Sequence, residues 1–205
     1  GLNCFPELYQ CANVSGDAYT VYTNKPTSGA MRGYGIPQAM WAGECHIDDI
    51  CTQLGFDPYE FRLLNSMERG HVNNFNKNEN FDDSLRQTLI KGADHIDFRA
   101  LRDRYQHQDP QARVRRGVGV ASFWYNTGVW PISLETSAAR MLVNEDGTLQ
   151  LQLGETEIGQ GADTVFAQMT ADSVGVPFQD VHVISTQDTD VTPFGLGAYA
   201  SRQTY

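Results

Sequence analysis

The sequence has few cysteines, and their spacing excludes two classes of metal protein. Cys4, Cys11, Cys45 and Cys51 are the four cysteines of the 205 residues, and no two of them form a C-x-x-C pair. A zinc ribbon or a self-contained iron–sulfur ligand set needs such pairs. The five histidines also lack paired metal-ligand spacing. We therefore expect no zinc ribbon and no self-contained iron–sulfur ligand set, and reduced thiols as in a cytoplasmic protein.

Long basic runs and long apolar runs are absent as well. Lys and Arg number 15 against 25 Asp and Glu, the formal net charge is -10, and the longest basic run is Arg115-Arg116. Nucleic-acid binding needs clustered Lys and Arg, so it is excluded. No apolar stretch approaches the roughly 18 residues that span a bilayer, and no signal-peptide pattern opens the chain. We expect a cytoplasmic protein that binds neither nucleic acid nor membrane.

The residues that are present predict helices in the first part of the chain. Hydrophobic residues make up 40% of the sequence, which is enough for a core. Residues 17–24 are β-branched and aromatic and predict a strand. Helical spacing from Pro37 to the stop at Gly55 predicts a long helix. Asp57-Pro58 predicts a second helix start, with a buried face formed by Phe61, Leu63 and Leu64.

The later part of the chain changes to strand-like patterns. Two helical patterns around 84–92 and 97–106 end at Asp109-Pro110, and the runs 117–125 and 133–143 then read as strands. Asp146-Gly147 lies between two such runs, which is a strong hairpin signal. A helix around 164–175 and a strand at 181–184 complete the pattern. We predict an α+β fold with mixed sheets and segregated helices, divided into domains 1–113 and 114–205.

Three segments concentrate glycine beside polar residues: Gly29–Gly35, Gly154–Gly161 and Phe194–Ser201, which we call the first, second and third loops. Glycine lets a ligand approach the backbone closely, and exposed amides can bind an anion. Each loop alone is more often plain turn chemistry. None has the spacing of an NTPase phosphate loop or of a dinucleotide fingerprint.

Together, the three loops resemble the molybdenum-binding subunit of xanthine dehydrogenases and related molybdenum hydroxylases. The resemblance rests on residues 23–38, on Glu155–Gly161, on 188–205, and on the helical segment 44–65 with Leu54-Gly55-Phe56-Asp57-Pro58. It implies part of an α+β domain pair that binds molybdopterin, either as such or as the cytosine dinucleotide. In this family the protein itself makes no direct bond to molybdenum.

The resemblance assigns cofactor contacts to all three loops. Arg32 and Ala200 match positions whose backbone lies near the molybdenum, although without the resemblance Arg32 is also consistent with a salt bridge at a helix start. Gln160 matches a glutamine that hydrogen-bonds the cofactor, between glycines that allow close approach. Arg202 and Gln203 could serve a longer dinucleotide tail. The expected cofactor-binding residues are Arg32, Gly159, Gln160, Gly161, Ala200, Ser201 and Gln203.

Substrate contacts are implied for Tyr34, Val129 and Trp130. Tyr34 matches an aromatic position that packs on a flat heterocycle. Val129-Trp130 stands where purine-hydroxylating members have Phe-Thr, so a hydroxyl for a purine heteroatom is missing. An aromatic heterocycle still suits the two rings. Carbon monoxide dehydrogenase is disfavoured because the first loop lacks the cysteine that bridges to copper.

The resemblance implies oxidative hydroxylation with water-derived oxygen. It also implies iron–sulfur clusters and FAD on other domains or subunits, in an oligomer. The family's catalytic glutamate lies downstream of the third loop, so no catalytic residue is expected in this chain and Glu44, Glu155 and Glu157 do not replace it. We expect a fragment that is inactive alone. A binding or scaffold module without chemistry, and an aldehyde- or acyl-CoA-type relative, are the alternatives.

Overall fold

Helix α1 (Ile36–Leu54) begins after Gly35 and ends at Gly55, whose backbone is left-handed. This confirms the predicted long helix. Met40 and Cys51 are buried, whereas Trp41 and Leu54 are largely exposed. The computed structural model describes residues 8–29, 31–73, 77, 79–128, 136–184 and 188–204. The chain divides into two units, residues 1–31 with 35–124 and residues 32–34 with 125–205, which we call the helical unit and the sheet unit.

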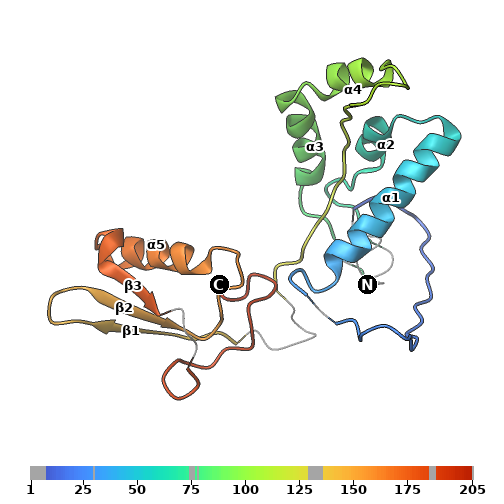
Figure 1. Cartoon of the computed structure of the whole chain (residues 1–205). Helices are drawn as coiled ribbons and strands as arrows, with labels where there is room; N and C mark the ends of the chain where they lie inside the picture. The colour runs from blue at the N-terminus through green and yellow to red at the C-terminus, as the bar shows by residue number, and fades with distance from the viewer. Residues whose placement is uncertain are drawn as a thin grey trace. The chain divides into compact units, whose positions relative to one another are not determined.

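The helical unit contains three more helices, which Figure 1 labels. They are α2 (Pro58–Asn65), α3 (Ser84–His95) and α4 (Phe98–Gln106). All three were predicted. One cluster of buried side chains joins Leu8 to Ile36, Ala39 and Met40 of α1. A second cluster joins α2, α3 and α4 through Tyr59, Leu89 and Phe98.

Three expectations for the helical unit are wrong. Residues 17–24 form no strand and are exposed, because no strand pairs with them in the described part of the chain. The stretch 117–125 is also not a strand; Val118 and Val120 pack against the α2–α3–α4 cluster instead. In α2, Leu64 is exposed. The face that is buried carries Tyr59 and Arg62, since Arg62 meets a carboxylate of α1.

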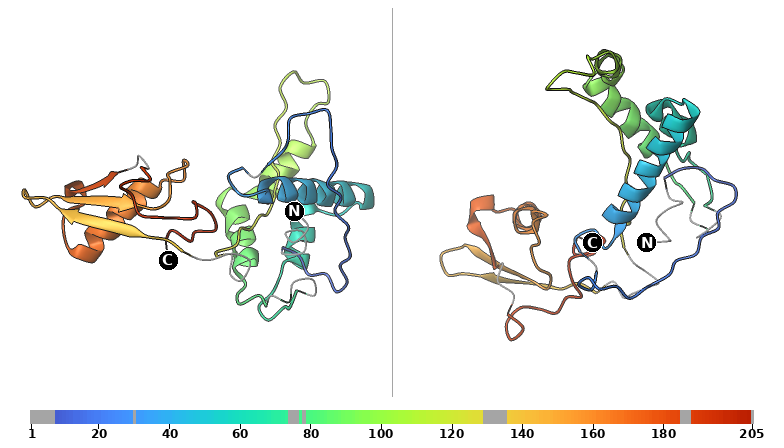
Figure 2. Two further views of the ribbon diagram at one scale, coloured as in Figure 1. Left: turned by 90° about the horizontal axis from the view of Figure 1, so that it is seen from below. Right: turned by 45° about the vertical axis from the view of Figure 1, so that its right-hand side comes forward.

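The sheet unit contains a three-stranded sheet in the order β1-β2-β3. Strands β1 (Ala139–Val143) and β2 (Leu149–Leu153) are antiparallel and form the predicted hairpin. Strand β3 (Val181–Ile184) runs parallel to β2. Helix α5 (Ala162–Val174) connects β2 to β3, with the short 3-10 helix η2 (Phe178–Asp180) before β3. Figures 1 and 2 show α5 lying along the sheet.

The core of the sheet unit lies between β2 and α5. Leu149, Leu151 and Leu153 alternate along β2 and are at most 5% exposed, and they pack against Phe166 and Ala167 of α5. This packing fixes the end of β2 and the start of α5. The second loop connects these two ends, so the core positions it. With helices and a small mixed sheet, the fold is α+β, as predicted. The domain boundary after residue 113 stays a prediction.

Candidate functional site

The second loop folds around its own carboxylate. Glu157 Oε1 accepts hydrogen bonds from the backbone N–H of Gly159 (2.6 Å) and Gly161 (3.0 Å), and Oε2 accepts one from the N–H of Asp163 (3.1 Å). Gly159 and Gly161 have φ of 91° and 84°, a conformation that favours glycine. The N–H of Gly161, followed by those of Asp163 and Gly159, lowers the pKa of Glu157. The Glu157 carboxylate thus accepts the hydrogen bonds of the backbone N–H groups at the start of α5.

Gln160 also turns back onto this loop. Its Oε1 accepts a hydrogen bond of 2.7 Å from the N–H of Ile158. This hydrogen bond fixes the side chain through its carbonyl oxygen. The NH2 group of the side chain is therefore the part that can donate to a ligand. Sequence reasoning identified the glutamine but not this internal hydrogen bond.

Arg32 of the first loop reaches the second loop within the sheet unit. Its Nη1 donates to the carbonyl oxygen of Ile158 at 3.2 Å. A Cβ on Gly159 would lie 2.8 Å from the same Nη1, so a larger residue there would displace the guanidinium, and the φ of 91° favours glycine at this position. The alternative of a salt bridge at a helix start has no support, since the described partner is a carbonyl. Arg32, Gly159, Gln160 and Gly161 therefore belong to one local structure.

The third loop packs directly on the start of the second loop. A Cβ on Gly154 would lie 2.7 Å from the carbonyl oxygen of Phe194, and a Cβ on Gly195 would lie 2.5 Å from Glu155 Oε1. Gln203 Nε2 donates to the carbonyl oxygen of Glu155 at 3.1 Å. Contacts between backbones this close leave no room for larger residues at the two glycines.

Glu155 and Arg202 form a buried ion pair between these loops. Arg202 Nη2 lies 3.2 Å from Glu155 Oε1, and both side chains are 0% exposed. Ser137 Oγ donates to Glu155 Oε2 at 2.9 Å, and Arg202 Nη1 donates to the carbonyl oxygen of Gly197 at 3.3 Å. The guanidinium also lies 4.9 Å from the centre of the Tyr199 ring. Glu155 was not predicted as a site residue, and Arg202 was predicted only for the tail of a longer dinucleotide cofactor. The pairing of the two depends on the packing of two distant loops.

Three of the predicted positions have a backbone conformation that is unusual for a non-glycine residue. Tyr34, Ala200 and Ser201 have φ of 55°, 52° and 54°, which non-glycine residues adopt rarely. Such conformations persist only where the surroundings impose them, and they cluster at functional sites. Ala200 is 1% exposed; its N–H donates to the Tyr125 hydroxyl at 3.2 Å, and its carbonyl accepts from the N–H of Gly128.

Tyr34 and Ser201 are exposed, Tyr34 by 74%. Both side chains are accessible, as a ligand contact requires. Val129 and Trp130, the other two predicted substrate residues, lie outside the described residues. The predicted cofactor residues of the second and third loops and Arg32 are thus all in the sheet unit, and contacts connect the three loops.

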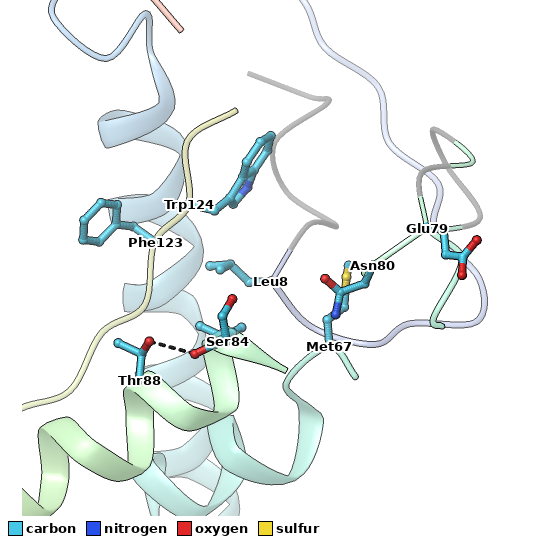
Figure 3. Close-up of a pocket in the computed structure, with 9 residues that line it drawn as sticks. Leu8, Met67, Glu79, Asn80, Ser84, Thr88, Phe123 and Trp124 are labelled. Atoms are coloured by element: carbon cyan, nitrogen blue, oxygen red, sulfur yellow. Dashed lines mark hydrogen bonds between the residues drawn. The ribbon is translucent and has the colours of Figure 1, made fainter. Parts of the chain in front are cut away.

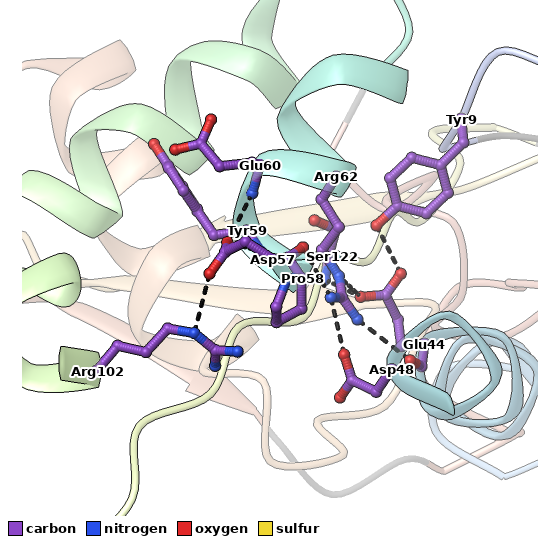
Figure 4. Close-up of polar contacts among 10 residues, drawn as sticks. All are labelled: Tyr9, Glu44, Asp48, Asp57, Pro58, Tyr59, Glu60, Arg62, Arg102 and Ser122. Carbon is purple, nitrogen blue, oxygen red and sulfur yellow. Dashed lines mark hydrogen bonds and ion pairs between the residues drawn. The ribbon is translucent and has the colours of Figure 1, made fainter. Parts of the chain in front are cut away.

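The helical unit has a buried polar cluster of its own (Figure 4). Arg62 Nε lies 2.7 Å from Glu44 Oε2, and Arg62 Nη1 lies 2.9 Å from Asp48. Glu44 also accepts hydrogen bonds from the Tyr9 hydroxyl (2.6 Å) and from the N–H of Ser122 (2.8 Å). Burial, together with the bond to Glu44, raises the pKa of Tyr9. Both carboxylate oxygens of Glu44 accept hydrogen bonds from α2 and the flanking segments, so the cluster stabilises the helical unit.

The helical unit also has a pocket of about 330 Å³, shown in Figure 3. No predicted site residue lines it. Polar and apolar side chains both line it: Leu8, Met67, Glu79, Asn80, Ser84, Leu85, Thr88, Phe123 and Trp124. Among the described residues, no group of three or more His, Cys, Asp or Glu side chains could hold a metal ion. No helix in the described ranges is long and apolar enough to span a membrane.

Comparison with known proteins identifies the class. The family model of a molybdopterin cofactor-binding domain matches residues 91–205, and a second model of the same description matches residues 1–66. The first match alone covers more than half of the chain. The chain therefore belongs to the molybdopterin cofactor-binding domain family, which confirms the resemblance seen in the three loops.

Individual relatives support the same family assignment. The xanthine dehydrogenase molybdenum-binding subunit of Escherichia coli O157:H7 is 49% identical over all 205 residues, which are 27% of its own length. Aldehyde oxidoreductase of Megalodesulfovibrio gigas is 32% identical over 76% of this chain and 16% of its own. The crystal structure of quinoline 2-oxidoreductase from Pseudomonas putida 86 matches with a TM-score of 0.64 and 30% identity, over 83% of this chain and 23% of that one. The chain spans about a quarter or less of these proteins.

Proposed function

We propose that this chain supplies cofactor-contacting loops of a molybdenum hydroxylase of the xanthine dehydrogenase type. It works within a longer protein, because its relatives extend far beyond the matched segment. The proposed reaction is oxidation of an aromatic heterocycle with water-derived oxygen. When bound, the molybdenum cofactor supplies the oxygen transfer and the two-electron oxidation. The residues of this chain bind and orient it, and the catalytic base belongs to another segment.

The donor set of the sheet unit fits a pterin with a phosphate. Such a ligand needs a cation, amide donors and close backbone approach. Arg32 provides the guanidinium, Gln160 the side-chain amide, and Ser201 an exposed hydroxyl. Gly159 and Gly161 have no side chain that would keep a ligand away from the backbone. Gln203 is held against the second loop by its bond to Glu155. Because the N–H of Ala200 is occupied by Tyr125, we assign Ala200 a positional role close to the metal.

One observation carries the proposal. Residues far apart in sequence meet in one unit, with Arg32 on Ile158 at 3.2 Å and Arg202 on Glu155 at 3.2 Å. A set of ordinary turns would have no reason to bring three glycine-rich loops together.

The substrate side of the proposal rests on Tyr34, Val129 and Trp130. An exposed ring at Tyr34 suits a planar heterocycle, and quinoline 2-oxidoreductase is a structural relative. Aldehyde oxidoreductase is also a relative, so aldehydes form the second substrate class to test. Iron–sulfur and FAD domains or subunits are the proposed electron acceptors, in a cytoplasmic oligomer.

The test is cofactor retention in the longer protein, purified with its cofactor. We expect Gln160→Ala to weaken retention by about 1 to 3 kcal/mol, because a buried pterin acceptor loses its donor. Molybdenum and pterin per protein are measured before and after prolonged dialysis. Gln168→Ala, an exposed glutamine of α5, is the matched control and should retain both. A parent protein without molybdenum, or a Gln160→Ala protein with parental content, contradicts the proposal.

A further inference from the structure

We propose that Glu155 and Arg202 act as a clamp that sets the spacing between the second and third loops. Neither residue contacts the cofactor in this proposal; both are positioning residues. The inference rests on the proposed function, because it assigns the clamp the task of holding two cofactor loops in register.

The geometry separates these residues from the ligand-facing ones. The side chains of Glu155 and Arg202 are fully buried, whereas those of Arg32 and Ser201 are exposed. A residue that binds the phosphate tail of a cofactor must be accessible. The cofactor-tail role expected for Arg202 from the sequence therefore does not fit its buried side chain. Its guanidinium is directed to Glu155, to the carbonyl of Gly197 and to the Tyr199 ring.

The clamp reaches both loops and the strand beside them. Glu155 directly follows Gly154, whose backbone lies against Phe194, and it accepts a bond from Ser137, just before β1. Arg202 directly follows the strained pair Ala200 and Ser201. A shift of either charged side chain therefore moves the backbone that carries the proposed cofactor contacts.

Charge pairing gives the clamp a distinctive response to mutation. Removing one partner of a buried ion pair leaves an uncompensated charge, whereas removing both can be nearly neutral. A clamp thus predicts that a double variant is less impaired than the single Arg202 variant. If Arg202 instead binds the cofactor, the single Arg202 variant and the double variant should be equally impaired, because the same contact is missing in both proteins.

The experiment uses Glu155→Gln, Arg202→Met and the double variant in the longer protein with its cofactor. Rates of molybdenum and pterin loss on dialysis are compared with thermal unfolding. We expect each single variant to lose cofactor roughly tenfold faster or more, and the double variant to lose it more slowly than Arg202→Met. Arg202→Lys, which keeps the charge, should recover most of the retention. Glu145→Gln, an exposed carboxylate in the β1–β2 turn, is the control.

Two outcomes overturn the clamp. Parental retention in Glu155→Gln, with equal loss in Arg202→Met and the double variant, would mean that Arg202 binds the cofactor itself. Lowered thermal stability with unchanged retention would mean that the pair is only structural. Should the single variants fail to fold, Ser137→Ala removes one bond to Glu155 and is expected to speed cofactor loss roughly twofold to tenfold; no change there counts against the clamp. Gln160→Ala separates the two proposals: if it strips molybdenum while the clamp variants do not, only the clamp fails.

Discussion

At the scale of single residues, Glu157 shows how a loop can satisfy its own amides. Three backbone N–H groups point at one half-buried carboxylate, and they lower its pKa. A carboxyl group whose pKa is lower in the folded protein stabilises the fold above its ordinary pKa. That contribution is lost as the pH falls through the lowered value. The second loop should therefore become less ordered as the pH falls into the acid range.

We expect hydrogen-exchange protection of the Gly159, Gly161 and Asp163 amides to fall on acidification, after correction for intrinsic exchange. In Glu157→Gln, protection should be low at every pH, because the amide has no charge to hold three donors. Exchange is followed by mass spectrometry on the peptide that contains the second loop. Glu145→Gln should behave as the parent. Equal protection in Glu157→Gln and the parent would show that the carboxylate does not order the loop.

Sequence reasoning found the residues whose chemistry is local. Gln160, Gly159 and Gly161 stand in one short string, and their left-handed backbone follows from glycine itself. Glu155 and Arg202 could not be paired in this way, because they are 47 positions apart and meet only when the third loop folds back. A charged residue inside a glycine-rich loop was the only signal that could have suggested burial.

At the scale of elements, helix α2 shows a cap that the sequence predicted. Asp57 Oδ1 accepts from the N–H of Tyr59 (2.8 Å) and of Glu60 (3.0 Å), and Oδ2 pairs with Arg102 Nε at 2.9 Å. Asp57 thus has a capping role and a pairing role, which two substitutions can separate.

Asp57→Ala removes the cap and should lower the free energy of unfolding by about 1 to 2 kcal/mol. Asp57→Asn keeps a capping oxygen and loses only the charge toward Arg102, so its cost should be about 0 to 1 kcal/mol, as for other solvent-accessible pairs. Urea denaturation of the three proteins measures both values. If Asp57→Asn lowers the free energy of unfolding as much as Asp57→Ala does, the ion pair rather than the cap stabilises the start of α2.

Elements were predicted well where their stabilising contacts are local and poorly where they are not. Helices α1 to α5 follow from spacing, proline starts and glycine stops, and the hairpin follows from Asp146-Gly147. Residues 17–24 have the composition of a strand, yet a strand needs a hydrogen-bonded neighbour, and the described chain offers none. The same reasoning explains 117–125, where Val118 and Val120 find helices to pack against.

At the scale of the whole molecule, the chain covers 27% of its Escherichia coli relative. In the longer protein proposed above, other segments would cover parts of the surfaces of the two units. Tyr34 is the clearest case at the proposed site, because its ring is 74% exposed although its backbone is held in a strained conformation. An aromatic side chain fixed in this way and left uncovered is suited to stacking on a planar molecule.

We therefore expect Tyr34→Ala in the longer enzyme to raise KM for an aromatic heterocycle by roughly tenfold, since the lost ring contact is worth about 1 kcal/mol beyond the buried area. Molybdenum content should stay at the parental level, because the contacts that link the loops come from Arg32, Glu155 and Arg202. Steady-state kinetics on a series of heterocycles and aldehydes, with metal analysis of each preparation, provides the measurement. Tyr34→Phe keeps the ring and should keep KM. A Tyr34→Ala protein that loses molybdenum while its remaining active fraction shows parental KM would place Tyr34 on the cofactor side and remove it from the substrate site.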